Sequence, residues 1–110
     1  METEIAHLHE QHPKLYGALR SNLEEVVEAI KQCPYQYPRA SQVRESIESP
    51  SANTRSCGQA LTGLAKLDVI DVYTERANSN RYDLTNFKPE RVRSLQQSLA
   101  ADVDRQRDSV

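Results

Sequence analysis

The sequence predicts a single α+β domain that is mostly helical. Three observations lead to this fold class. Apolar residues recur at helical spacing in several stretches, the segment after residue 68 alternates between apolar and polar residues instead, and clusters of turn-forming residues separate these stretches. At 110 residues the chain has the length of one domain with a modest core.

The first thirteen residues are expected to form a polar N-terminal extension. Ile5 and Leu8 are its apolar anchors, and we expect the segment to be frayed. Pro13 then stands where the first turn of a helix tolerates proline. From residue 14 to residue 32, about one third of the helical wheel carries the apolar side chains, namely Leu15, Leu19, Leu23, Val26, Val27 and Ile30.

A short second helix is predicted to follow a break in the chain. Pro34 and Pro38 lie within five residues of each other and cannot continue a helix. Ser41 is a suitable N-cap for a helix from Gln42 to Glu48. Pro50 marks a tight connection to the next element.

A third helix and a β-hairpin are predicted next. Asn53 or Thr54 can cap a helix that runs to about Leu67. Residues 69–73 are rich in β-branched and aromatic side chains, which favours a strand. An asparagine-rich turn at residues 76–80 then leads to a second strand at residues 81–85.

The last predicted helix runs from Pro89 to about Arg107. Its apolar residues form a narrow stripe with nearly the spacing of a coiled-coil seam: Val92, Leu95, Leu99 and Val103. We expect this stripe to form a homodimer, through this helix alone or together with the first helix. The alternative is that the last helix folds back on the first helix of its own chain.

This order of elements is the winged helix-turn-helix arrangement, in which a short helix, a tight turn, a second helix and a hairpin follow one another. We predict an N-terminal extension at residues 1–13, a winged helix-turn-helix domain at 14–86 and a C-terminal dimerisation helix at 87–110. The second helix of such a motif lies in the major groove of double-stranded DNA.

The third helix carries the candidate groove contacts. On a helical wheel Gln59, Thr62 and Lys66 fall within about 40° of Arg55. The opposite side is apolar, with Cys57, Ala60, Leu61, Leu64 and Leu67. Ser51, Asn53 and Thr54 precede or begin this helix, where such helices meet the groove. Arginine and glutamine are suited to read guanine and adenine. An ordinary solvated helix face is the alternative.

The hairpin carries the candidate contacts of a wing. Arg76 and Arg81 stand at the ends of the turn, with Asn78 and Asn80 between them. Arginine on a wing contacts the phosphate backbone or enters the minor groove. The alternative is an asparagine-rich turn with solvated arginines.

The residues of this region resemble those of a known group. Within the run Ser56–Ile70 the predicted helix ends in Leu-x-x-Leu at Leu64–Leu67 and leads directly into a strand, and the hairpin closes on Tyr-x-Leu-Thr at Tyr82–Thr85. This pattern resembles the small prokaryotic winged-helix transcriptional regulators of the PadR, MarR and ArsR type, including archaeal stress-responsive members. The resemblance covers Val43 to Thr85 and implies a regulator that answers an effector or stress signal. Asp68 replaces the usual glycine after the recognition helix.

Other reactive side chains predict little further chemistry. His7, His9 and His12 include ligand types for Zn²⁺ or Ni²⁺, but such spacing is common by chance, so we predict neither metal nor cofactor. We interpret Cys33 and Cys57 as reduced thiols, with a redox switch at Cys57 as the alternative. No nucleophile–base pair, phosphate loop or paired acids are present in the sequence, and we expect no enzyme.

We therefore predict a cytoplasmic, homodimeric transcriptional regulator that binds specific double-stranded DNA, with a stress or redox response as a further expectation. The sequence has neither a membrane-spanning apolar run nor the features of a signal peptide. Its net charge of −2 requires that any DNA contact rest on local clusters of Arg and Lys. The same charge favours the rival prediction, a winged helix that assembles with other proteins.

Overall fold

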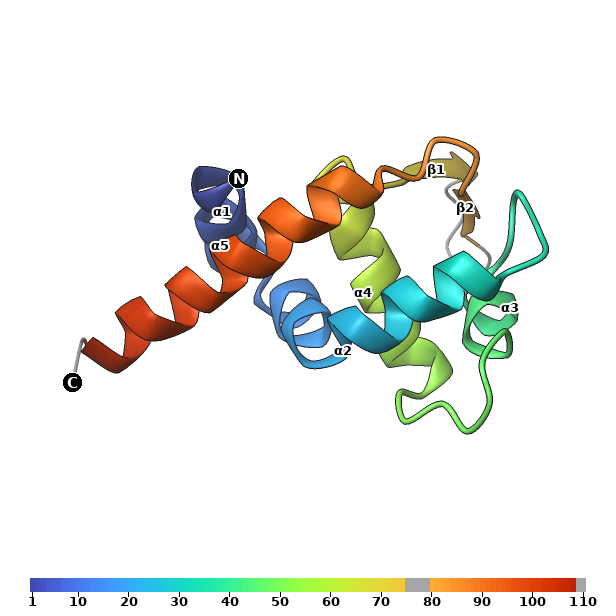
Figure 1. Cartoon of the computed structure of the whole chain (residues 1–110), viewed down its shortest axis with the longest axis horizontal. Coiled ribbons are helices and arrows are strands. Elements are labelled where there is room, and N and C mark those ends of the chain that lie inside the picture. Colours follow the sequence, from blue (N-terminus) through green and yellow to red (C-terminus); the bar gives the residue numbers. More distant parts are fainter. Residues whose placement is uncertain (75–79, 109–110) are drawn as a thin grey trace.

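The computed structural model describes residues 1–74 and 80–108; of residue 74 and residues 103–108 only the backbone is described. The elements follow in the order α1 (Glu2–Gln11), α2 (Pro13–Gln32), α3 (Ala40–Arg44), α4 (Thr54–Lys66), β1 (Asp71–Thr74), β2 (Arg81–Asp83) and α5 (Pro89–Asp108). The fold is α+β and mostly helical, with one two-stranded antiparallel sheet (Figure 1).

The core lies between α2 and α4, the pair of helices with the most extensive contact. All five residues that the sequence placed on the apolar side of the third helix are buried: Cys57, Ala60, Leu61, Leu64 and Leu67. The α2 side chains Leu19, Leu23, Val26, Val27 and Ile30 are buried in the same cluster. The binary pattern of these two helices therefore predicted the core.

The N-terminal segment is not frayed, and that prediction is wrong. Residues 2–11 form α1, whose Ile5 and Leu8 are 0% and 3% exposed in the main core. The helix packs on both α2 and α5. Because helices of this length gain most of their stability from tertiary packing, two well-placed apolar side chains are enough to fix it.

The short helix α3 begins and ends earlier than predicted, at Ala40–Arg44 rather than at residues 42–48. Gln42 accepts a hydrogen bond from the backbone N–H of Arg39 at 2.9 Å, which satisfies a group at the start of the helix. Beyond Arg44 the chain turns, and Ser49 has a φ of 50° in the left-handed region. Ser41 lies inside the helix instead of capping it.

The two strands pair with Asp71 opposite Asp83 and Val72 opposite Tyr82, and the register is irregular between Val72 and Thr74. Both strands are shorter than predicted. A third extended segment, which no sequence pattern predicted, lies beside β2. The N–H of Tyr82 donates to Pro38 O at 2.9 Å, and Arg39 and Arg81 form an antiparallel bridge.

Asp68 closes the C-terminus of α4 although it replaces the usual glycine. Its φ of 61° is left-handed, a conformation that aspartate tolerates better than most residues. The N–H of Asp68 donates to Ala65 O and the N–H of Val69 donates to Leu64 O, so two terminal carbonyls are satisfied. Lys88 lies 3.0 Å from the Asp68 carboxylate and lowers the pKa of this group.

The apolar stripe of α5 is used within the chain. Val92, Leu95 and Leu99 are 7%, 0% and 7% exposed in the main core. The expectation of a free seam is therefore wrong for these three residues, while Val103 lies outside the described side chains. Buried Asp102 of α5 accepts a hydrogen bond from Tyr16 of α2, and His9 of α1 stacks on Tyr16 with 3.9 Å between ring centroids.

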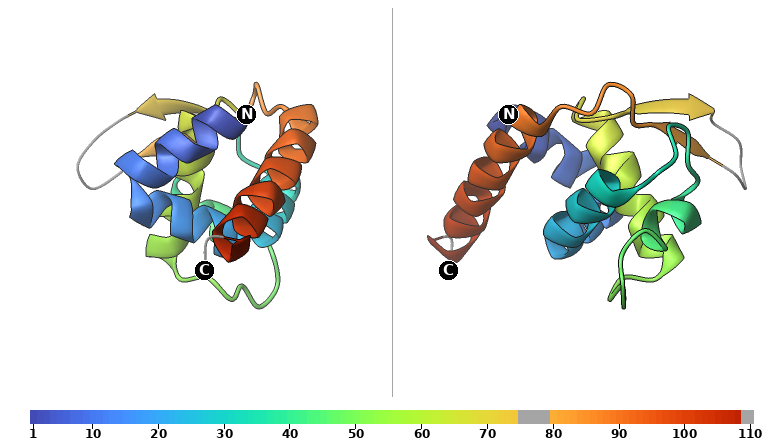
Figure 2. Two further views of the ribbon diagram at one scale, coloured as in Figure 1. Left: turned by 90° about the vertical axis from the view of Figure 1, so that its left-hand side faces the viewer. Right: turned by 45° about the vertical axis from the view of Figure 1, so that its right-hand side comes forward.

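The hairpin and α5 lie on opposite sides of the molecule (Figure 2, left). The last turns of α5 extend past the rest of the fold (Figure 1). Within the described residues, none of the helices combines the length and the hydropathy that crossing a bilayer requires.

Candidate nucleic-acid interface

The start of α4 is fixed by its predicted cap. The Asn53 side chain accepts a hydrogen bond from the Ser56 N–H at 2.7 Å. Asn53, Thr54 and Arg55 are all exposed at this end of the helix. Because the first N–H groups of a helix point outward along its axis, this end favours an anion.

A carboxylate on α2 fixes the loop that leads into α4. Glu25 accepts hydrogen bonds from the N–H groups of Ser51 and Ala52, at 2.6 and 3.0 Å. These two bonds, first that from Ser51, hold the pKa of Glu25 below its usual value of 4.5. Arg44 donates from Nε to Ala52 O at 2.6 Å. The turn between α3 and α4 is thus held from both sides, although Ser51 itself is exposed.

The predicted contact residues do not all face solvent equally. Arg55 and Lys66 are exposed, whereas Gln59 is half-buried. Thr62 is also half-buried, and its hydroxyl donates to Gly58 O at 2.9 Å and lies 3.0 Å from the Tyr82 hydroxyl. This network joins α4 to β2, so the Thr62 hydroxyl has a structural role that the sequence did not indicate.

A groove of about 490 Å³ runs between α2 and α4 beside Arg55 and Gln59. Its α2 side consists of small or uncharged residues together with one cation, Lys14, which is exposed. Among the described residues that line this groove there are two cations, Lys14 and Arg55, and no carboxylate. Sequence reasoning missed Lys14, because only the packing of α2 on α4 brings it beside the predicted contact face.

Lys66 has different surroundings at the other end of α4. A second groove, of about 440 Å³, places it with Glu4 and His7 of α1 and with His12, which lies between α1 and α2. The carboxylate of Glu4 lies 3.3 Å from Arg91. Because Glu4 of α1 lies in the same groove as Lys66, the positive charge on the exposed face of α4 is concentrated at the end that carries Arg55, where Lys14 lies nearby.

Of the two predicted wing arginines, the structure describes one, Arg81. Arg81 is exposed at the start of β2, and Asn80 before it is half-buried. The predicted contacts Arg76 and Asn78 lie outside the described residues. Tyr82, next to Arg81, turns the other way and contacts α4, so the packing of the strand on α4 fixes the direction of Arg81.

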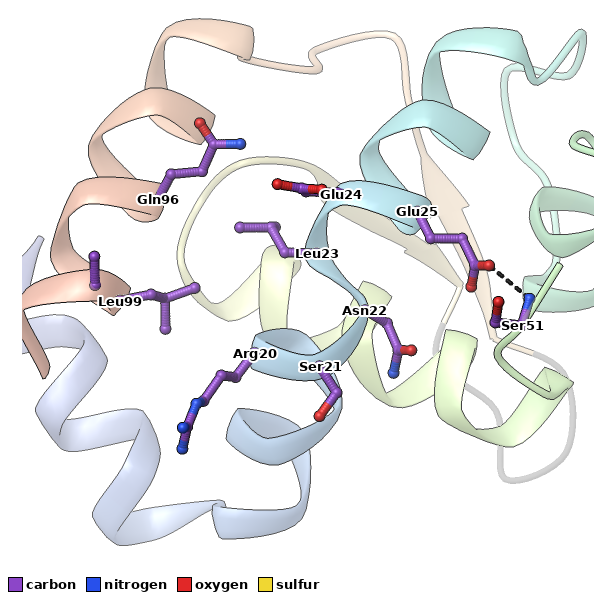
Figure 3. Close-up of a pocket in the computed structure, with 10 residues that line it drawn as sticks. Arg20, Ser21, Asn22, Leu23, Glu24, Glu25, Ser51, Gln96 and Leu99 are labelled. Carbon is purple, nitrogen blue, oxygen red and sulfur yellow. Dashed lines mark hydrogen bonds between the residues drawn. The ribbon is translucent and has the colours of Figure 1, made fainter. Parts of the chain in front are cut away.

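A larger groove, of about 580 Å³, lies between α2 and α5. Figure 3 shows Leu23 of α2 and Leu99 of α5 in it, with Gln96, Arg20 and Glu24 nearby. Its described lining includes Glu24 and Glu25 and a single cation, Arg20. The dashed line in Figure 3 marks the hydrogen bond from the Ser51 N–H to Glu25. The lowered pKa of Glu25 therefore results from its bonds to the loop before α4.

The three histidines near the N-terminus lie in different surroundings. His9 stacks on Tyr16, while His7 and His12 line the groove beside Lys66. Over the described part of the chain, no group of three or more His, Cys, Asp or Glu side chains could hold a metal ion.

Cys57 is 3% exposed, and its thiol lies 3.8 Å from Ala40 O. Burial raises the pKa of this thiol to about 11. Because only the thiolate reacts readily, the redox-switch alternative at Cys57 is not supported, and the residue behaves as a small buried apolar group. Cys33 is half-buried.

Iodoacetamide at pH 8 is therefore expected to modify Cys33 in the native protein and leave Cys57 unmodified. Mass spectrometry should show one adduct before denaturation and two after it. The Cys33→Ser variant is the matched control and should show no adduct while folded. Modification of folded Cys33→Ser at the rate of a free thiol would contradict the burial of Cys57.

Comparison of the chain with protein-family models, with curated proteins and with solved structures found no match.

Proposed function

We propose that the chain is a winged helix-turn-helix regulator of transcription that binds double-stranded DNA. The observation that carries the proposal is the exposed face of α4. This helix contains no acidic residue, and its Arg55 and Gln59 lie beside Lys14 in a groove whose described lining includes no carboxylate. In a chain of net charge −2, phosphate binding requires a local cluster of cations free of acids, such as this one.

The arrangement of the strands supports the same proposal. The extended segment before α3 pairs with β2, and β2 pairs with β1. Because β1 follows α4 in the chain, the hairpin is connected both to the start of α3 and to the end of α4. In this geometry α4 enters the major groove while Arg81 contacts the backbone on the hairpin side. Arg55 and Gln59 then read base edges, and Lys14 contacts a phosphate.

A homodimer remains part of the proposal, but its contact differs from the predicted seam. Because Val92, Leu95 and Leu99 of the stripe are buried in their own chain, a partner would meet the exposed face of α5 or its projecting last turns (Figure 1). Two copies would present two α4 helices to half-sites about one helical turn of DNA apart. Sedimentation equilibrium of the wild-type chain measures the association directly.

Selection of duplexes from a random pool tests the function. The wild-type chain should enrich one sequence, in two related half-sites if it is a dimer, whereas a Gln59→Ala variant should enrich it less. A chain that retains no duplex at low salt would overturn the proposal. The role of a protein-assembly module, which the net charge favours, would then replace it.

A further inference from the structure

The outer face of the small sheet carries a cluster of exposed tyrosines. Among the residues whose burial is described, the exposed large apolar side chains are Tyr35, Tyr37 and Tyr73, at 53%, 37% and 58%. Tyr37 and Tyr73 contact each other, with 4.3 Å between ring centroids and 35° between ring planes. Tyr35 and Tyr37 line one groove of about 360 Å³. We call these three residues the tyrosine cluster.

Strand geometry places two arginines on the same face. Pro38 and Tyr82 are buried against the helices, and side chains alternate between the faces of extended backbone. Tyr37, Arg39 and Arg81 therefore lie on the outer face. Arg39 and Arg81 are both exposed, and they are direct bridge partners.

This pair of arginines is unfavourable without a ligand. Like charges directly opposite each other on two strands destabilise the pairing. Among the described residues, no carboxylate forms a salt bridge with either guanidinium group. The acids on the same sheet are engaged elsewhere: Asp83 accepts from the Thr85 N–H at 2.9 Å, and Asp71 accepts from Asn86. An anion between the two arginines would relieve the repulsion.

We propose that the outer face of the sheet binds single-stranded DNA. The rings of Tyr37 and Tyr73 lie beside Arg39 and Arg81 on this face. A nucleotide can bind both kinds of side chain, because its base stacks on an aromatic ring while its phosphate pairs with the guanidinium groups. Bases of a duplex already stack on one another, so free tyrosine rings select unpaired bases. This site shares Arg81 with the proposed duplex interface, but its tyrosines and Arg39 lie outside the exposed face of α4, and stacking on them does not depend on duplex binding by that helix.

Fluorescence anisotropy of a labelled oligothymidylate tests the proposal. The wild-type chain should bind it, and the double substitution Tyr37→Ala/Tyr73→Ala should weaken binding about tenfold or more, since each stacked base contributes substantially. The matched control Tyr37→Phe/Tyr73→Phe keeps both rings and should bind within about twofold of the wild type. Because the chain contains five tyrosines and no tryptophan, quenching of its intrinsic fluorescence gives a second readout.

Two further measurements separate this site from the proposed duplex site. The alanine double variant should retain duplex binding and the wild-type melting temperature, because both rings are exposed. Equal binding of the oligothymidylate by the alanine variant and the wild type would overturn the proposal, as would a wild type that binds none at low salt. So would a self-association of the wild type that the alanine variant loses, since the cluster would then be a contact between copies.

Discussion

The Glu25→Ala variant is expected to lose about 2 kcal/mol of unfolding free energy at pH 7. The substitution removes the acceptor of two backbone N–H groups, at Ser51 and Ala52. Hydrogen bonds to a charged group contribute about 1.5–3 kcal/mol each, and we reduce their sum because one of them is solvent-exposed. Urea unfolding followed by circular dichroism measures the change. Glu24→Ala is the matched control, because this neighbouring carboxylate is exposed.

The same contact predicts a dependence on pH. The pKa of Glu25 is lowered in the folded chain, so its stabilising effect is complete above the unfolded value of 4.5 and is lost as the pH falls through the folded pKa. The wild type and Glu25→Ala should therefore converge in stability at acid pH. A Glu25→Ala variant no less stable than Glu24→Ala at pH 7 would show that the loop does not depend on this clamp.

Gln59→Ala and Arg81→Ala are expected to weaken DNA binding in different ways. Gln59 lies beside Arg55 in the groove between α2 and α4 and is proposed to read a base edge, so its loss should cost about 1–3 kcal/mol on a selected site and little on random duplexes. Arg81 stands on the hairpin and is proposed to contact phosphate. Its loss should weaken binding to both kinds of DNA and reduce the slope of log K against log salt by about one.

Competition titrations at several salt concentrations separate these two effects. A Gln59→Ala variant that loses affinity equally for selected and random duplexes would assign Gln59 to the backbone. An Arg81→Ala variant with an unchanged salt slope would remove the hairpin from the interface.

Local signals explain why α4 could be predicted. Asn53 caps the helix as expected. The helical wheel puts Arg55 and Cys57 on opposite sides of α4, and in the structure Arg55 is exposed while Cys57 is buried. Capping and amphipathic spacing act within a few residues of sequence. Arg55 and Arg81 are therefore exposed as these local patterns predict, whereas Gln59 is half-buried.

Contacts between distant segments explain what could not be predicted. The helix α1 depends on Ile5 entering a core built by other elements. The extended segment at Pro38 is fixed by hydrogen bonds to β2, more than forty residues later in the chain. Lys14 and the tyrosine cluster gain their positions from the same kind of packing, which no short-range pattern encodes.

Salt-dependent duplex binding by a charge-reversal pair tests the central claim most directly. Lys14→Glu/Arg55→Glu reverses the two cations of the groove between α2 and α4. Arg20→Glu/Arg93→Glu makes the same change in net charge at exposed positions of α2 and α5 away from that groove. The first variant should lose duplex binding at moderate salt and reduce the salt slope by about two, while the second stays near the wild type. Equal losses in the two variants would contradict a DNA interface centred on α4.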